Sequence, residues 1–310
     1  MQSMSAPILE ARGLTKRYGD RAVVDRLDLV CRRGTVLGLL GANGAGKTTT
    51  LRMLYGFVPP DAGAIFYGGQ SFAEGRAAAK RSIGVCTQDD SLDYDFTVEQ
   101  NLRIYASYFR PKVQNLDARI AGLLERFDLA GYADASPHVL SGGYVRRLLI
   151  ARSIVHGPKV LFLDEPTTGL DPSARLDVWE LIDGLRAEGL AIVLTTHYMD
   201  EAERLSDELL IIHEGRSVAH GEPHRVIDTV LGDHVIIVPK GEPAREEIGA
   251  WLKSRGAHEV VTVLGELRVP ISKEDLAELT QRFTDASWQV RTPNLDDLFI
   301  ALARGNGRSE

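Results

Sequence analysis

The sequence predicts an α/β fold, in which a mainly parallel sheet core carries a helical subdomain and is followed by a small C-terminal α+β domain. Short apolar runs alternate with helical patterns over roughly the first 220 residues, which is typical of parallel strands covered by helices. After Gly221 a second, shorter series of strand and helix patterns begins. We place the large domain at residues 1–225, its helical subdomain at about 90–156, and the small domain at 226–310.

Three apolar runs of the large domain are expected to be buried strands: Val36–Leu40, Lys159–Leu163 and Leu190–Thr195. Each run ends in polar or glycine residues and is soon followed by a helical pattern. Parallel strands end at one edge of a sheet, so we expect ligand chemistry at that carboxyl edge. The helical patterns Thr97–Tyr108 and Leu116–Phe127 have no strand pattern between them and predict the helical subdomain.

The small domain shows strand patterns separated by two helical patterns, which predicts an α+β unit. The expected strands are His234–Pro239, Val260–Leu264, Leu267–Pro270 and Trp288–Thr292, and the expected helices are Ala244–Arg255 and Lys273–Phe283.

Composition excludes several classes of protein. No apolar stretch approaches the roughly 18 to 20 residues needed to cross a bilayer, and Met1–Glu10 lacks the features of a secretion signal, so we expect a cytosolic chain. The net charge of −7 disfavours broad attraction to nucleic acid, although Arg146 and Arg147 form a small basic patch. Cys31 and Cys86 match no metal or redox spacing and are expected to be packing residues with free thiols.

A phosphate-binding loop is predicted between the first apolar run and the helical pattern Thr48–Leu54. Its sequence is Gly41-Ala-Asn-Gly-Ala-Gly-Lys-Thr48, in the strand–loop–helix setting of a P-loop. Glycines let backbone N–H groups approach phosphate oxygens, Lys47 can reach the β- and γ-phosphates, and the Thr48 hydroxyl can bind Mg²⁺. The residues that we assign to the nucleotide here are Gly41, Asn43, Gly44, Ala45, Gly46, Lys47, Thr48 and Thr49.

A second anchor is the apolar strand that ends in Asp164-Glu165-Pro166. Two carboxylates at the end of a buried strand are expected to face a ligand or an ion; the alternative is a salt-bridged strand end. We expect Asp164 to hold the magnesium shell and Glu165 to polarise the attacking water.

Leu140-Ser-Gly-Gly143, followed by the helical run Tyr144–His156 and then by the acidic strand, resembles the signature of the ABC ATPase family. The resemblance runs from about Ile8 to His220 and implies a P-loop ABC ATPase domain. In this family the signature binds the γ-phosphate of a nucleotide held by the opposite subunit. The resemblance therefore implies that Ser141, Gly142 and Gly143 bind ATP in a homodimer.

Single residues that resemble other family marks follow in the family's order. By this resemblance, Tyr18 stacks on adenine, Gln88 couples magnesium and the attacking water to the helical subdomain, Asp171 lies in the D-loop, and His197 is the switch histidine that bonds the γ-phosphate. We therefore assign catalytic roles to Glu165, His197 and Gln88. Metal binding is assigned to Thr48, Gln88 and Asp164, and the expected cofactors are ATP and Mg²⁺.

Longer segments, among them Thr195–Leu205 and Asn294–Leu302, are similar to exporters of the nodulation-factor, drug-resistance and polysaccharide type. This similarity implies an integral membrane permease as partner and a place on the cytoplasmic face of the cell membrane. From its separate α+β pattern, we expect the small domain to have an accessory or regulatory role. Two departures from the family pattern are Tyr144, where Met or Gln is more usual, and Cys86 before Thr-Gln, where Pro-Gln is more usual.

Two other functions remain open. The chain could be a soluble ABC ATPase that acts on DNA, ribosomes or iron–sulfur assembly, but it has one cassette and no room for a long coiled-coil insertion between Gln88 and the signature. It could also be a regulatory subunit with little turnover, although Glu165 is present. We expect the remaining histidines to be solvated or capping residues, and the acidic residues Asp200, Glu201 and Glu203 to pair with Arg204 or to face water.

Overall fold

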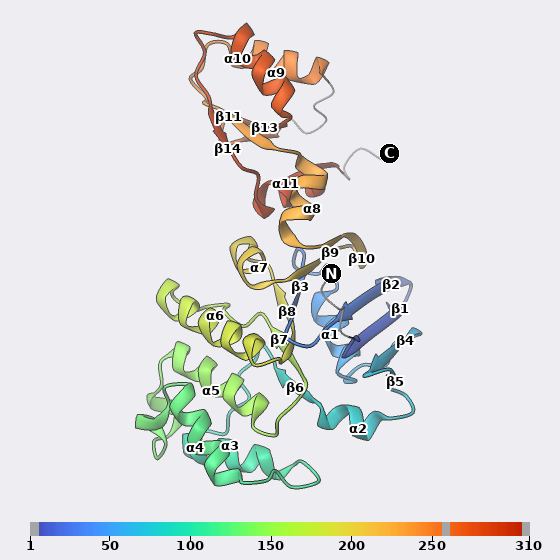
Figure 1. Cartoon of the computed structure of the whole chain (residues 1–310), viewed down its shortest axis with the longest axis vertical. Helices are drawn as coiled ribbons and strands as arrows, with labels where there is room; N and C mark the ends of the chain where they lie inside the picture. The colour runs from blue at the N-terminus through green and yellow to red at the C-terminus, as the bar shows by residue number, and fades with distance from the viewer. Residues whose placement is uncertain (1–5, 256–260, 306–310) are drawn as a thin grey trace. The chain divides into compact units, whose positions relative to one another are not determined.

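The computed structural model describes residues 6–255 and 261–305 and divides into two compact units, Met1–His220 and Gly221–Glu310 (Figure 1). Val260, the first residue of one expected strand, lies outside the described residues. Within the described residues, no helix combines the length and apolar character that a membrane crossing requires.

The core of the first unit is a six-stranded sheet with the order β10-β9-β3-β8-β7-β6. Strand β3 pairs in parallel with β8 and β9, and β7 pairs in parallel with β6 and β8, so the predicted mainly parallel sheet is confirmed. The strands are β3 (Val36–Leu40), β6 (Ile83–Cys86), β7 (Val160–Asp164), β8 (Ala191–Thr196), β9 (Glu208–His213) and β10 (Arg216–Gly221).

Both faces of this sheet are covered, which explains why its strands are continuous apolar runs. In β7, Leu161 and Leu163 belong to the cluster beneath the helices, whereas Val160 and Phe162 belong to the cluster on the opposite face. The helices of the unit are α1 (Lys47–Leu54), α2 (Arg76–Arg81), α3 (Val98–Ser107), α4 (Leu116–Arg126), α5 (Gly142–Ile154), α6 (Pro172–Ala187) and α7 (Met199–Leu205).

A separate four-stranded sheet, which the sequence analysis did not predict, lies in the same unit with the order β2-β1-β4-β5. Its strands are β1 (Leu9–Tyr18), β2 (Arg21–Cys31), β4 (Ala62–Tyr67) and β5 (Gln70–Ser71), and all of its pairings are antiparallel. Leu9, Leu14 and Leu27 from this sheet share one apolar cluster with α1 and β3. The sheet therefore covers the face of the core on which the P-loop helix packs.

Helices α3, α4 and α5 form the predicted helical subdomain, seen in green in Figure 1. Helix α3 begins with a capping box, in which the Thr97 hydroxyl accepts from the Gln100 backbone and the Gln100 side chain accepts from Thr97 N–H. Phe127 at the end of α4 is fully buried in the cluster that joins these helices to the sheet.

The second unit is an antiparallel sheet with two helices on one face. The unit has a ferredoxin-like arrangement, with the chain order β11, α9, β12, β13, α10, β14 and the sheet order β12-β13-β11-β14. The predicted small α+β domain is therefore confirmed. Its elements are α8 (Pro223–Leu231), β11 (His234–Val238), α9 (Arg245–Ser254), β12 (Val261–Val263), β13 (Glu266–Ile271), α10 (Lys273–Arg282), β14 (Gln289–Arg291) and α11 (Leu295–Gly305).

Three interpretations of isolated polar residues are wrong. His156 is partly buried rather than solvated: its ring stacks on Phe109 at a centroid distance of 3.7 Å and its Nδ1 is buried. Glu201 neither pairs with Arg204 nor faces water, because it is fully buried. Arg146 is also buried, with 7% of its surface exposed, and is not part of a basic patch.

The two cysteines match their expectation. Cys31 and Cys86 are buried free thiols, and burial raises the pKa of Cys31 to about 12. Both therefore pack as small apolar side chains and stay protonated at neutral pH.

Candidate active site

The P-loop approaches other backbone so closely that glycine is required at two of its positions. A Cβ on Gly41 would lie 2.3 Å from the carbonyl oxygen of Ile212, and one on Gly46 would lie 2.5 Å from that of Val23. Gly46 also has a φ of 109°, in the region that favours glycine. The loop is thus fixed between β9 and β2 in the turn that opens helix α1.

Lys47 is held at the centre of this loop with only 5% of its surface exposed. Its ammonium donates to the carbonyl oxygens of Gly41, at 2.7 Å, and Ala42, at 3.1 Å. Burial lowers the pKa of Lys47, while the nearby carboxylates of Glu165 and Asp164 act in the opposite direction. Because a phosphate is a stronger acceptor than a carbonyl, this ammonium is placed for a phosphate ligand.

Asp164 joins β7, α1 and β8 through a single carboxylate oxygen. Its Oδ1 accepts from Thr48 Oγ1 at 3.2 Å and from Thr195 Oγ1 at 2.6 Å. The residue is 7% exposed. The two hydroxyls fix the orientation of the carboxylate, and Thr195 is a site residue that the sequence analysis did not assign.

Glu165 has an unusual backbone for a non-glycine residue, with a φ of 49°. Such a conformation costs on the order of 1–3 kcal/mol and persists where the surrounding structure holds it. Here the Glu165 N–H donates to the hydroxyl of Thr195 at 3.0 Å. The turn directs the Glu165 side chain into the group of catalytic candidates.

The carboxylate of Glu165 brings together the three residues that were predicted to act in catalysis. Its Oε2 accepts from Gln88 Nε2 at 3.4 Å and from Thr168 Oγ1 at 3.2 Å. Its Oε1 lies 3.3 Å from Nδ1 of His197, in an orientation that does not make a hydrogen bond. Thr168, like Thr195, was not predicted.

The oxygen atoms of Thr48, Asp164 and Gln88 suit a hard cation such as Mg²⁺. Magnesium in nucleotide sites is typically bound by one or two carboxylates together with substrate phosphates, rather than by an all-protein cage. The fixed Asp164 carboxylate and the adjacent Thr48 hydroxyl have this character. The residues present therefore fit the metal.

The signature segment lies at the start of helix α5. Ser141 is the N-cap residue, yet its side chain makes no capping hydrogen bond, and Gly142 and Gly143 form the first turn. A Cβ on Gly143 would meet that of Ala174 at 3.0 Å, so the turn packs closely on helix α6. The Ser141 hydroxyl and the first N–H groups of α5 make a site suited to a phosphate group.

The remaining two candidates differ in their surroundings. Asp171 is the N-cap of α6, where its Oδ1 accepts from Ser173 N–H and Ala174 N–H, each at 3.0 Å. This gives Asp171 a structural role in the chain itself. Tyr18 ends strand β1 with 54% of its surface exposed, which leaves its ring accessible for stacking. Within the described residues, neither Ser141 nor Tyr18 hydrogen-bonds to the cluster around Glu165.

Two buried charged residues connect the site to its surroundings, and the sequence analysis misread both. Arg146 of α5 donates to the carbonyl oxygens of Thr87, at 3.1 Å, and Gln88, at 3.5 Å, so the signature helix holds the loop that carries Gln88. Glu201 of α7 accepts from Thr167 Oγ1 at 2.7 Å and from Trp179 Nε1 at 3.0 Å.

Comparisons with known proteins agree with this geometry. Residues 24–168 match the family model described as "ABC transporter". The chain is 44% identical over 302 residues to a Nod factor export ATP-binding protein I of Ralstonia nicotianae, covering 96% of this chain and 94% of the relative.

Two solved structures also resemble the chain. One is cbiO1 from Clostridium perfringens, described as part of the ABC transporter complex cbiONQ, with a TM-score of 0.65, 28% identity, and coverage of 73% of this chain and 96% of the other. The second is an ATP-binding cassette of an ABC transporter in its ADP conformation, with a TM-score of 0.65, 25% identity, and coverage of 74% and 96%.

Proposed function

Because this chain belongs to the family of ABC transporter ATP-binding subunits, we propose that two copies of it power export through a separate integral membrane permease. The chain is an ATPase of that family. The observation that carries the proposal is the cluster around Glu165, whose strained backbone orients its carboxylate beside the P-loop and beside both Gln88 and His197.

ATP binding is assigned to the P-loop and to Tyr18. The N–H groups of the loop and Lys47 bind the phosphates, and Thr48 and Thr49 lie at the start of α1, where the helix dipole favours negative charge. The exposed ring of Tyr18 is assigned to the adenine base. Mg²⁺ is assigned to Thr48, Asp164 and Gln88, and when bound it would neutralise charge on the phosphates.

Hydrolysis is assigned to Glu165 acting on a water molecule. The carboxylate accepts from Gln88 and Thr168 through Oε2, which leaves Oε1 as the oxygen free to accept a proton from water. His197, 3.3 Å from that oxygen, is placed to donate to the γ-phosphate on the other side. Attack of the water on phosphorus releases ADP and inorganic phosphate.

A homodimer is supported by the unused phosphate donors of the signature. Ser141 caps no N–H group of its own helix, and it makes no hydrogen bond with the P-loop cluster among the described residues. A γ-phosphate held by a second copy would bond to both the Ser141 hydroxyl and the start of α5. Binding of ATP would then draw two copies together, and hydrolysis would let them separate.

The dimer is tested by measuring the molecular mass of the protein in solution with and without ATP. The Glu165→Gln variant should be monomeric without nucleotide and dimeric with saturating ATP in light scattering. The Glu165→Gln, Ser141→Arg double variant should still bind ATP but stay monomeric, because the Arg side chain fills the γ-phosphate contact. Equal dimerisation of the double variant would contradict the shared site.

Export is the function named for the relative from Ralstonia nicotianae, and an ABC transporter complex is named for the cbiO1 structure. We extend both to this chain and place it on the cytoplasmic face of the cell membrane, with the second unit in an accessory or regulatory role. Affinity purification from native membranes should recover one integral membrane protein in stoichiometric amount. Recovery of ribosomes or DNA in its place would refute the assignment.

A further inference from the structure

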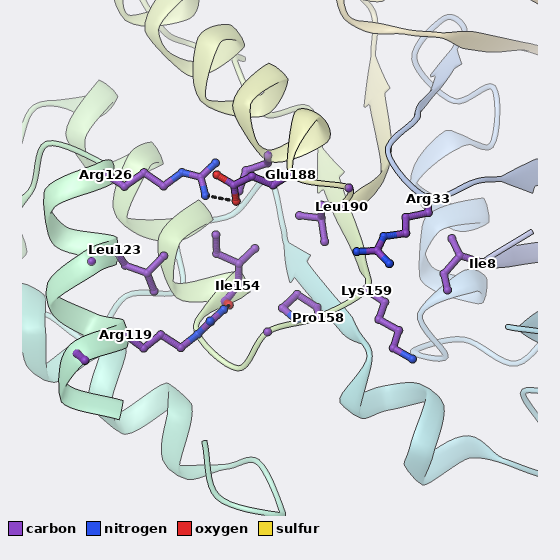
Figure 2. Close-up of a pocket in the computed structure, with 15 residues that line it drawn as sticks. Ile8, Arg33, Arg119, Leu123, Arg126, Ile154, Pro158, Lys159, Glu188 and Leu190 are labelled. Atoms are coloured by element: carbon purple, nitrogen blue, oxygen red, sulfur yellow. Dashed lines mark hydrogen bonds and ion pairs between the residues drawn. The ribbon is translucent and has the colours of Figure 1, made fainter. Parts of the chain in front are cut away.

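The first unit contains a cavity of about 600 Å³ that is separate from the site around Glu165 (Figure 2). Lys159 and Leu190, which line it, immediately precede strands β7 and β8. Asp164 and Thr195, which belong to the active site, lie at the opposite ends of the same strands. The cavity therefore opens at the amino edge of the sheet, one strand length from the P-loop.

Two helices connect the cavity to the candidate active site. Helix α5 starts at the signature and ends at Ile154, which lines the cavity, and α6 starts after Asp171 and passes Leu185, which also lines it. With 13 residues in α5 and a rise of 1.5 Å per residue, the cavity lies about 20 Å from Ser141. A ligand here would be distinct from the nucleotide.

Positive charge gathers around this cavity although the chain as a whole carries a net charge of −7. Figure 2 shows the guanidinium groups of Arg119 and Arg126 directed into the space from α4 on one side and that of Arg33 from the opposite side, with Lys159 near Arg33. Glu188 is the only acidic residue among those that line it. The lining thus carries four cationic side chains and one carboxylate.

Each of the three guanidinium groups lies against a glycine. A Cβ on Gly157 would be 3.6 Å from Arg119 Nη2, one on Gly184 would be 3.5 Å from Arg126 Nη2, and one on Gly189 would be 2.9 Å from Arg33 Nε. At Gly189 an added side chain would displace the Arg33 guanidinium from its present position. The guanidinium groups therefore pack directly against the backbone of these glycines.

Two of the three arginines have no acidic partner within the described residues. Arg126 pairs with Glu188 at 2.6 Å, but Arg33 forms no ion pair there, and Arg119 donates to the carbonyl oxygens of Ile154 and Val155 instead of to an acid. Burial lowers the pKa of Arg119, although both Arg119 and Arg33 remain exposed to solvent. An anionic ligand would supply the acidic partner that these two cations lack.

We propose that this cavity binds a small organic phosphate. Guanidinium groups form two parallel hydrogen bonds with phosphates and carboxylates alike. A phosphate carries nearly two negative charges and three acceptor oxygens, so several cationic side chains favour it over a monovalent carboxylate. The side chains of Ile8, Leu123, Ile154 and Leu190 form an apolar wall for the organic part of the ligand. The volume lies within the range typical of small-molecule sites.

Occupation of the cavity would link the helical subdomain to the core of the unit. Arg119 and Arg126 come from α4, whereas Arg33 lies in the turn before β3 and Lys159 lies in the loop before β7. A phosphate held by the arginines of α4 on one side and by Arg33 and Lys159 on the other would restrain α4 relative to the sheet. Amide exchange in Leu116–Arg126 is therefore expected to slow when the ligand binds.

The test is calorimetric titration of the full chain with phenyl phosphate, with inorganic phosphate and phenol as partial probes. Lys47→Ala is introduced throughout, so that the P-loop contributes little phosphate binding. Phenyl phosphate should bind with one site per chain and more tightly than either partial probe. Arg33→Gln should weaken this binding about tenfold or more, because it removes a charge-assisted hydrogen bond.

Lys112→Gln is the matched control, since Lys112 is an exposed cation that does not line the cavity. It should bind phenyl phosphate as the Lys47→Ala chain does, and Arg33→Lys should retain part of the affinity. Thermal melting of each variant checks that it is folded. Equal affinity of the Arg33→Gln and Lys112→Gln chains, or the absence of saturable binding, would overturn the proposal without bearing on ATP hydrolysis.

Discussion

His156 is expected to make the stability of the first unit depend on pH. Its Nε2 lies 2.9 Å from the carbonyl oxygen of Ile83, and because a carbonyl only accepts, Nε2 carries the proton of the neutral ring. Nδ1 is buried without a hydrogen-bond partner. Protonation of Nδ1 would therefore place a charge and an unbonded N–H inside the protein.

The size of the effect follows from the pKa. Burial lowers the pKa of His156 from 6.5 to about 4; the hydrogen bond to Ile83 opposes this shift and the charge of Arg119 adds to it. Between pH 6.5 and 4 the unfolded chain binds a proton that the folded chain does not, so stability is lost as the pH falls through this range. With 1.36 kcal/mol for each pH unit between 6.5 and 4.5, the loss by pH 4.5 is about 2.5 kcal/mol.

The assay is urea unfolding of the wild type and of His156→Phe at pH 7 and pH 4.5. Phenylalanine can keep the stacking on Phe109 but loses the hydrogen bond to Ile83, which costs about 1 kcal/mol at pH 7. At pH 4.5 the order should reverse, because only the wild type pays for the buried proton. The exposed His138, changed to Phe, serves as the control. A stability difference that is the same at both pH values would refute the reasoning.

Three further predictions concern the candidate site and the second unit. Glu165→Gln should bind ATP within a few-fold of wild type but lower turnover by about 10² to 10⁴ in a phosphate-release assay, since an amide cannot accept the proton of water; unchanged turnover would exclude the role. Asp171→Ala should destabilise the first unit by about 0.5–2 kcal/mol in urea unfolding, because two N–H groups of α6 lose their acceptor, and Asp171→Asn should recover most of the loss. Deletion of 221–310 should leave ATP affinity within a few-fold in a filter-binding assay, because the nucleotide residues lie in the first unit; a folded truncation that no longer binds ATP would contradict this.

The strands of the parallel sheet could be predicted because burial on both faces makes them continuous apolar runs. The antiparallel sheet could not, because strand β1 does not keep the period of two that marks a half-buried strand. Its register against β2 shifts between Ala11 and Leu14 and again between Leu14 and Lys16. The first irregularity adds a residue to β1, so the side chains that follow it move to the other face and the pattern in the sequence is lost.

The candidate site also contains residues that could be predicted from the sequence and residues that could not. The P-loop and the pair Asp164-Glu165 are contiguous, so their chemistry can be read directly from residue types and spacing. Thr195 orients both acids through its hydroxyl, yet a threonine inside a buried strand has the same pattern as valine or isoleucine. The arginines of the cavity come from separate elements, and no sequence spacing relates Arg33 to Arg119.

Arg146 shows how burial changes the meaning of a charged residue. Adjacent arginines on a helix indicate an exposed basic patch only if both face water, but Arg147 pairs with Asp128 and Asp177 while Arg146 is buried against the loop that carries Gln88. A buried guanidinium is retained only where acceptors satisfy it, and here the carbonyl oxygens of Thr87 and Gln88 do so. A displacement of helix α5 would therefore be passed through Arg146 to the carbonyl oxygens of Thr87 and Gln88. The Gln88 side chain, which contacts Glu165, would move with them. The segment that we propose to bind the phosphate of a second copy is thus hydrogen-bonded to the loop whose Gln88 side chain contacts Glu165.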